Sequence, residues 1–143
     1  EAVHWYTRRW GIEVYHRILK SGCRIEERQL ATEDRLERCL GIDLVVAWRL
    51  FHLTMLAREC PELPASVCLD EAEWQVLCAN FTGALPAQPP TLKQAILWIG
   101  RLGGYVARPK DYLPGTVTMW RGIVTLQTMV VGWRLARGMP AGP

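Results

Sequence analysis

Apolar residues in this chain recur at every third or fourth position, which limits the folds available to it. Trp10, Val14 and Ile18 repeat at intervals of four residues, and Gly22 ends the run. This spacing follows the 3.6-residue period of an α-helix, whereas no stretch shows the strict alternation of apolar and polar residues typical of a half-buried strand. The sequence therefore predicts an all-α fold.

Capping residues and prolines set the expected helix ends. Asp70 and Glu73 have the spacing of a capping box, Thr91 is a suitable N-cap, and Pro61 and Pro64 close the long helix before them. We expect helices over residues 3–20, 36–59, 71–82, 92–102 and 116–137. A short helix or a loop is expected over 23–35, and linkers over 84–90 and 105–115.

Charged residues are distributed in blocks along the chain. Residues 4–24 hold five Lys or Arg against one acid, residues 39–78 hold two against six, and residues 79–143 hold seven against one. The two basic blocks are typical of a chain that meets a polyanion. A solvated surface of mixed charge is the alternative that this distribution leaves open.

The longest apolar stretch runs from Leu40 to Leu56 and is interrupted by Asp43, Arg49 and His52. These ionisable residues argue against an ordinary membrane span. The N-terminus lacks the apolar core of a signal peptide, and no Cys/His spacing suits zinc. We therefore expect reduced thiols, no membrane partner and a cytoplasmic protein.

Five polar residues of the first expected helix are spaced by 3, 4, 4 and 3 positions, namely Tyr6, Arg9, Glu13, Arg17 and Lys20. On a helix they share one face, about 21 Å long at 1.5 Å per residue. The length and the charge of this face suit several DNA phosphates, and its carboxylate suits a Mg²⁺ ion that bridges to a phosphate oxygen. Ordinary i,i+4 ion pairs between Glu13 and the two arginines are the alternative interpretation.

The pattern Tyr-x2-Arg-x3-Glu-x6-Lys resembles the signature of the insertion-sequence-four family of DDE DNA transposases, which includes the transposon Tn-five enzyme. Four specified residues would match a chain of this length by chance about once in a thousand times. The resemblance extends over Trp5 to Gly22, Glu27-Arg28-Gln29 and Leu36-Glu37-Arg38. It returns in residues 91–104, in Trp120-x-Gly122 and in Leu126-Gln127, which resemble the family's C-terminal dimerisation region.

The resemblance implies a role for each residue of the signature. Glu13 matches the third carboxylate of the Asp-Asp-Glu triad, which binds Mg²⁺ or Mn²⁺ in the full-length enzyme. Tyr6, Arg9 and Lys20 match residues that hold transposon-end DNA, and Arg17 stands where the transposon enzyme has a lysine, also placed towards DNA. The family's chemistry is metal-assisted hydrolysis followed by strand transfer to target DNA.

The resemblance also implies a division of the chain. Residues 1–35 are expected to end a ribonuclease-H-like catalytic core, and residues 36–143 to form a helical dimerisation domain in a bacterial cytoplasmic protein. The two metal-binding aspartates would lie on strands before Glu1. Because one carboxylate cannot hold two Mg²⁺ ions, we expect this chain alone to bind no metal and to be inactive.

Two functions therefore remain open at this point. The chain is either the C-terminal part of a cut-and-paste transposase, or a stand-alone module without catalysis that self-associates and holds the DNA backbone. Both require a dimer seam, which we place on the last helix. Leu126, Val130, Trp133 and Arg137 follow the 4, 3, 4 spacing of such a seam.

Overall fold

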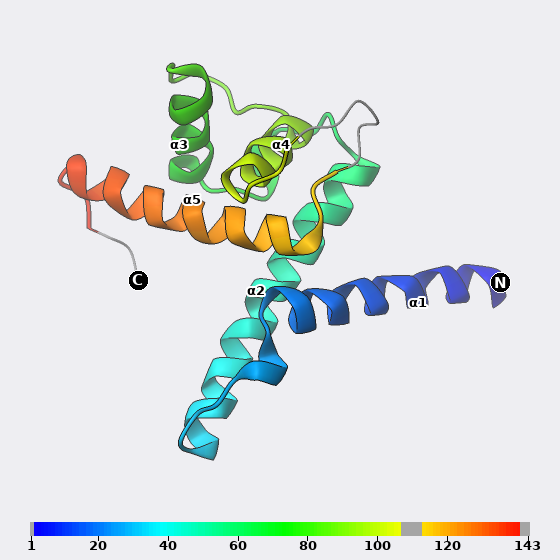
Figure 1. The fold of residues 1–143 in the computed structure, drawn as a ribbon. Helices are drawn as coiled ribbons and strands as arrows, with labels where there is room; N and C mark the ends of the chain where they lie inside the picture. The colour runs from blue at the N-terminus through cyan, green and yellow to red at the C-terminus, as the bar shows by residue number, and fades with distance from the viewer. Residues whose placement is uncertain (1, 107–112, 141–143) are drawn as a thin grey trace. The chain divides into compact units, whose positions relative to one another are not determined.

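A computed structural model describes residues 2–106 and 113–140, with side chains described for 9–106 and 113–140. The described residues form five α-helices (Figure 1). These helices are α1 (Ala2–Arg17), α2 (Glu33–Glu59), α3 (Glu71–Thr82), α4 (Leu92–Leu102) and α5 (Thr116–Ala136). Within these residues there is no β-strand and only one isolated bridge, between Pro64 and Thr91, so the all-α prediction is confirmed.

The ends of α3, α4 and α5 lie within one residue of the predicted ones, because their signals are local. Glu73 N donates to Asp70 Oδ1 at 2.7 Å and Asp70 N donates to Glu73 Oε2 at 2.9 Å, which completes the capping box. Gly83 closes α3 with a φ of 69°, a left-handed conformation that glycine adopts without steric cost. Thr91 accepts a hydrogen bond from Gln94 N and so caps α4.

The first two helices differ from the prediction at their ends. The α-helical part of the first one stops at Arg17, and a π-helical turn, η1 (Ile18–Gly22), follows it, in which Cys23 N donates to Ile18 O at 3.0 Å. A short 3₁₀ turn, η2 (Ile25–Glu27), occupies part of residues 23–35, where a short helix or a loop is predicted. Helix α2 begins at Glu33, three residues earlier than predicted, because Thr32 Oγ1 accepts a hydrogen bond from Arg35 N. The predicted linker over 84–90 contains no helix, and part of the one over 105–115 lies outside the described residues.

The chain divides into two compact units, Glu1–His52 and Leu53–Pro143, which we describe separately. In the first unit, Tyr15 of α1 packs edge-on against Trp48 and Phe51 of α2, and its hydroxyl donates to Leu44 O at 3.1 Å. The predicted domain boundary after residue 35 falls in the first turn of α2 and stays a prediction.

In the second unit, α5 packs against both α3 and α4. The contact with α4 is between backbones. A Cβ atom on Gly122 would lie 1.9 Å from Ile99 O, and one on Gly103 would lie 1.9 Å from Thr118 O. The core of this unit consists of fully buried aliphatic side chains, which include Leu77, Leu92, Ile96, Ile99, Met119 and Leu126. A 3₁₀ turn, η3 (Ala65–Val67), precedes α3.

Helix α2 is, among the described helices, the one long and apolar enough to cross a bilayer by length and composition alone. It nevertheless carries Asp43, which is buried and bound to Arg28. An ion pair within a membrane span is costly. The expectation that the chain has no membrane partner remains a prediction.

Candidate nucleic-acid and dimer interfaces

The cationic face of the first helix is exposed to solvent. Arg9, Glu13 and Arg17 of α1 and Lys20 of η1 are all exposed, while Val14, Ile18 and Leu19 on the other side of the same segment are buried. The side chain of Tyr6, the remaining residue of the predicted face, lies outside the described part. One carboxylate and three cations of this segment therefore face the solvent.

Glu13 stands apart from its neighbouring arginines. Among the side chains described, it forms no ion pair with Arg9 or Arg17, so the i,i+4 pairs of the alternative interpretation are not formed there. Nor do three His, Cys, Asp or Glu side chains gather as a possible metal site anywhere in that part. Because Mg²⁺ prefers several oxygen ligands, Glu13 by itself does not form a magnesium site.

The π-helical turn changes where Lys20 points. A π turn holds more residues than the 3.6 of an α turn, so each residue advances by less than 100° and Lys20 is rotated away from the line of Arg9, Glu13 and Arg17. Its Nζ lies 2.8 Å from Glu26 Oε1, and that hydrogen bond, together with the charge of Glu26, raises the pKa of Lys20 above its ordinary value. Among the described side chains of the predicted face, Lys20 thus has a carboxylate partner, whereas Arg9 and Arg17 form no ion pair with a described carboxylate.

The segment after η1 is fastened to α2 through Asp43. Arg28 Nη2 donates to Asp43 Oδ1 at 2.9 Å, and the Cys23 thiol donates to the Asp43 carbonyl at 3.6 Å. Burial, and secondarily the charge of Asp43, raise the pKa of the Cys23 thiol to about 11. Between these two anchors Arg24 has a φ of 53°, a left-handed conformation that costs a non-glycine residue roughly 1–2 kcal/mol. The anchors at both ends hold the segment in this conformation.

The predicted dimer seam lies on the inner face of α5. Leu126 and Val130 are 0% and 2% exposed and belong to the core of the second unit. Trp133 is half-buried, with the guanidinium of Arg137 stacked 4.0 Å above its ring, and Arg137 also donates to Gln75 of α3. The dimer role of these four residues stays a prediction, but their side chains are occupied within their own unit.

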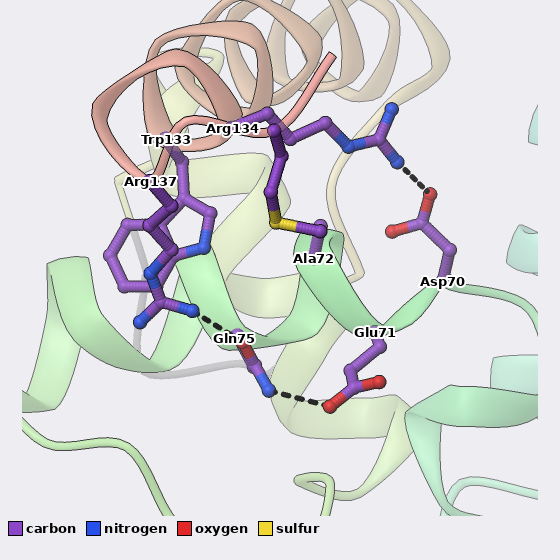
Figure 2. A pocket seen from close by; sticks show the side chains of 8 residues that line it. Asp70, Glu71, Ala72, Gln75, Trp133, Arg134 and Arg137 are labelled. Atoms are coloured by element: carbon purple, nitrogen blue, oxygen red, sulfur yellow. Dashed lines mark hydrogen bonds and ion pairs between the residues drawn. The ribbon is translucent and has the colours of Figure 1, made fainter. Parts of the chain in front are cut away.

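A cavity of about 370 Å³ lies at this contact between α3 and α5 (Figure 2). Arg134 pairs with Asp70 at 3.2 Å on one side, and Gln75 links Arg137 to Glu71 on the other. Each guanidinium that lines the cavity therefore already has a partner. The cavity is best described as part of the α3–α5 contact.

The opposite face of α5 carries a stripe of exposed residues, Val117, Arg121, Val124, Thr128, Val131 and Leu135. We call this set the outer stripe. Its members are spaced by 4, 3, 4, 3 and 4 positions, and at 100° per residue they lie about 180° from the buried face. Val124 is 49% and Leu135 61% exposed. The sequence-based prediction of the seam does not include this stripe, although the seven-residue interval between its valines is visible in the sequence.

Two buried polar groups have a role that the sequence does not indicate. Glu73 was predicted only as a cap, yet it is 1% exposed and also accepts a hydrogen bond from Gln127 of α5. Asp43 interrupts an apolar stretch in the sequence, and in the structure it binds Arg28. Both partners are distant in the sequence, so no local pattern indicated either contact.

A comparison with family models bears on the second unit directly. Residues 45–141 match a family model described as the transposase Tn5 dimerisation domain. The match covers α3, α4 and α5 entirely, together with the second half of α2.

Proposed function

The chain belongs to the transposase Tn5 dimerisation domain family, and on that premise we propose that it acts as the C-terminal region of a cut-and-paste DNA transposase that pairs two enzyme copies. In this role it holds the two copies together while each contacts the backbone of transposon-end DNA. Target DNA and a bacterial cytoplasmic location belong to the same proposal. The observation that carries it is the outer stripe of α5, whose four apolar side chains are left exposed within a domain whose family is named for dimerisation.

The outer stripe suits a second copy of the same helix. A 4, 3 spacing of apolar residues lets two helices pack with their side chains interlocked. When a helix pairs with its own copy about a two-fold axis, the same patch is used on both sides. Arg121 and Thr128 interrupt the apolar residues, which weakens the seam and favours one register over others.

Sedimentation equilibrium tests this seam. Val124→Asp places a charge at the centre of the outer stripe without touching the core, so we expect a monomer where the wild-type chain is a dimer. Val67→Asp is the matched control, because Val67 is similarly exposed but lies in η3. The proposal fails if Val124→Asp sediments like wild type, or if the wild-type chain is itself a monomer.

The exposed cations of the first helix, and Lys20 of η1 after it, are proposed to contact DNA phosphates. Arg9 and Arg17 carry this part of the proposal, since both are exposed and neither pairs with Glu13 in the described part of the chain. Each phosphate contact contributes about 0.9 to the slope of log affinity against log salt. Binding to a DNA duplex can be followed by fluorescence anisotropy at several salt concentrations. Arg9→Gln and Arg17→Gln should each reduce the magnitude of the salt slope by about 0.9.

Arg38→Gln provides the control for that measurement. Arg38 is exposed on α2 and pairs with Asp34, so the change removes the same charge from a different place. If Arg38→Gln lowers the slope as much as Arg9→Gln does, the contact is not specific to the first helix.

Glu13 is proposed as the third carboxylate of the Asp-Asp-Glu site in the full-length enzyme. A divalent ion bound there, Mg²⁺ or Mn²⁺, would supply the activation of water for strand cleavage. In the described part of the chain Glu13 belongs to no group of three possible metal ligands, so the other carboxylates of this site are proposed to come from the rest of the full-length enzyme. In the full-length enzyme, Glu13→Gln should abolish cleavage and leave DNA binding intact, and retained cleavage would exclude the assignment.

A further inference from the structure

The short segment that follows the cationic face is held at both ends by one buried residue. The Cys23 thiol donates to the backbone carbonyl of Asp43, and Arg28 Nη2 donates to its carboxylate at 2.9 Å. The Asp43 side chain is only 5% exposed, so it is a fixed point on α2. The backbone between Cys23 and Arg28 is therefore confined to one path.

That path brings Glu26 to Lys20. Glu26 lies in η2, and its Oε1 is 2.8 Å from Lys20 Nζ. Six positions separate the two residues, whereas neighbours on one helix surface are three or four positions apart. The Lys20–Glu26 ion pair therefore forms because the anchored segment brings Glu26 close to Lys20. The neighbouring Glu27 pairs instead with Arg24.

We propose that Glu26 is an intramolecular competitor of DNA phosphate for Lys20. A carboxylate and a phosphate are both anionic acceptors for the lysine ammonium group. With Glu26 in place, the pair is neutral as a whole, and a phosphate that approaches Lys20 meets a negative charge beside it. The inference rests on the proposed function in one respect, namely that Lys20 contacts the DNA backbone.

The expected effect is modest, because both side chains are largely exposed to water. Pairs of this kind change an equilibrium by about two- to five-fold, and salt screens them. Glu26→Gln should therefore tighten binding to a short random-sequence DNA duplex by about two- to five-fold at low salt, with a smaller gain as salt rises.

A double-mutant cycle isolates this effect from a general gain of positive charge. The chains to compare are wild type, Glu26→Gln, Lys20→Gln and the double variant, with Glu27→Gln as the matched control. If Glu26 acts through Lys20, its substitution tightens binding more than Glu27→Gln does, and the extra gain disappears in the Lys20→Gln background. Far-UV circular dichroism and melting curves verify that each chain is folded.

The contrary outcomes are distinguishable from one another. Equal gains from Glu26→Gln and Glu27→Gln in both backgrounds indicate a plain charge effect and overturn the inference alone. If Lys20→Gln binds DNA more weakly than wild type but Glu26→Gln binds no more tightly, the inference is likewise overturned and the proposed function is not. If Lys20→Gln binds DNA like wild type, Lys20 is not a phosphate contact, and that part of the proposed function fails together with the inference.

Discussion

The buried carboxylate of Glu73 on α3 accepts a hydrogen bond from the side-chain amide of Gln127 on α5. Its second oxygen, Oε2, accepts the backbone N–H of Asp70 at 2.9 Å, so one side chain both caps α3 and ties it to α5. Glu73 is 1% exposed, and in the described part of the chain every buried side-chain N or O atom has a hydrogen-bond partner. The contact between α3 and α5 is thus polar as well as apolar.

Glu73→Ala should destabilise the second unit by about 2–4 kcal/mol. The change removes one cap, worth about 1 kcal/mol, and leaves buried groups unsatisfied at about 1–3 kcal/mol. Urea denaturation followed by circular dichroism measures the loss. Glu71→Ala is the control, since Glu71 lies exposed in the same first turn, and an equal loss in both variants would contradict the role of Glu73.

Two glycines of α5 should respond in opposite directions to the same substitution. In Gly122→Ala the new Cβ would meet the backbone of Ile99, so α4 and α5 must separate at a cost of about 1–3 kcal/mol. In Gly132→Ala the Cβ meets nothing within 4 Å, and the helix should gain about 0.5–1 kcal/mol. Thermal unfolding of both variants compares them, and a stabilising Gly122→Ala would rule out the close backbone contact.

Asp43→Asn should destabilise the first unit by about 1–3 kcal/mol. The substitution removes the charge that Arg28 binds, and hydrogen bonds to charged groups contribute about 1.5–3 kcal/mol, reduced here because Arg28 is partly exposed. Asp34→Asn on the same helix breaks an exposed pair with Arg38 and should cost less than about 1 kcal/mol. Chemical denaturation of the two variants should therefore differ, and similar midpoints would show that the Arg28–Asp43 pair contributes no more than a surface pair.

The Cys23 thiol should make stability depend on pH in the alkaline range. Its pKa is raised from 9.0 to about 11 in the folded chain, so the folded state favours the protonated thiol. The corresponding stability is fully present below pH 9.0 and is lost as the pH rises through about 11. Cys60 is exposed, so Cys60→Ala is the control that keeps the buried Cys23 thiol. Between pH 9.0 and about 11, the unfolding free energy should fall less steeply in Cys23→Ala than in Cys60→Ala. Identical declines in the two variants would exclude the thiol as the cause.

Much of the fold was predictable because its signals are local. The capping box of Asp70 and Glu73, the N-cap Thr91 and the closing Gly83 each act within a few residues, and the helices that they delimit lie where the sequence placed them. The π-helical turn at Ile18 was not predictable. A π-helical turn contains one residue more than an α-helical turn. The apolar residues before Ile18 keep their α-helical spacing, so they give no sign of this extra residue.

Helix α5 shows why the sequence alone does not fix which of its faces is buried and which is exposed. Helix α5 is apolar on nearly all sides, so Leu126 and Val130 fit a 4, 3 spacing as well as Val124 and Val131 do. Which set faces the core is decided by Gly122, whose missing side chain lets α5 lie against Ile99 of α4. That contact joins two helices across a long connection, and no local pattern encodes it.

Charge complementation at Val131 tests the central claim, pairing through the outer stripe, most directly. Val131 is 41% exposed, so neither Val131→Asp nor Val131→Lys should disturb the core. With a two-fold axis that sets Val131 against its own copy, light scattering should find each variant alone as a monomer and an equimolar mixture of the two as a dimer, because opposite charges then replace like charges across the seam. If each variant alone keeps the dimer mass of the wild-type chain, the outer stripe is not the seam.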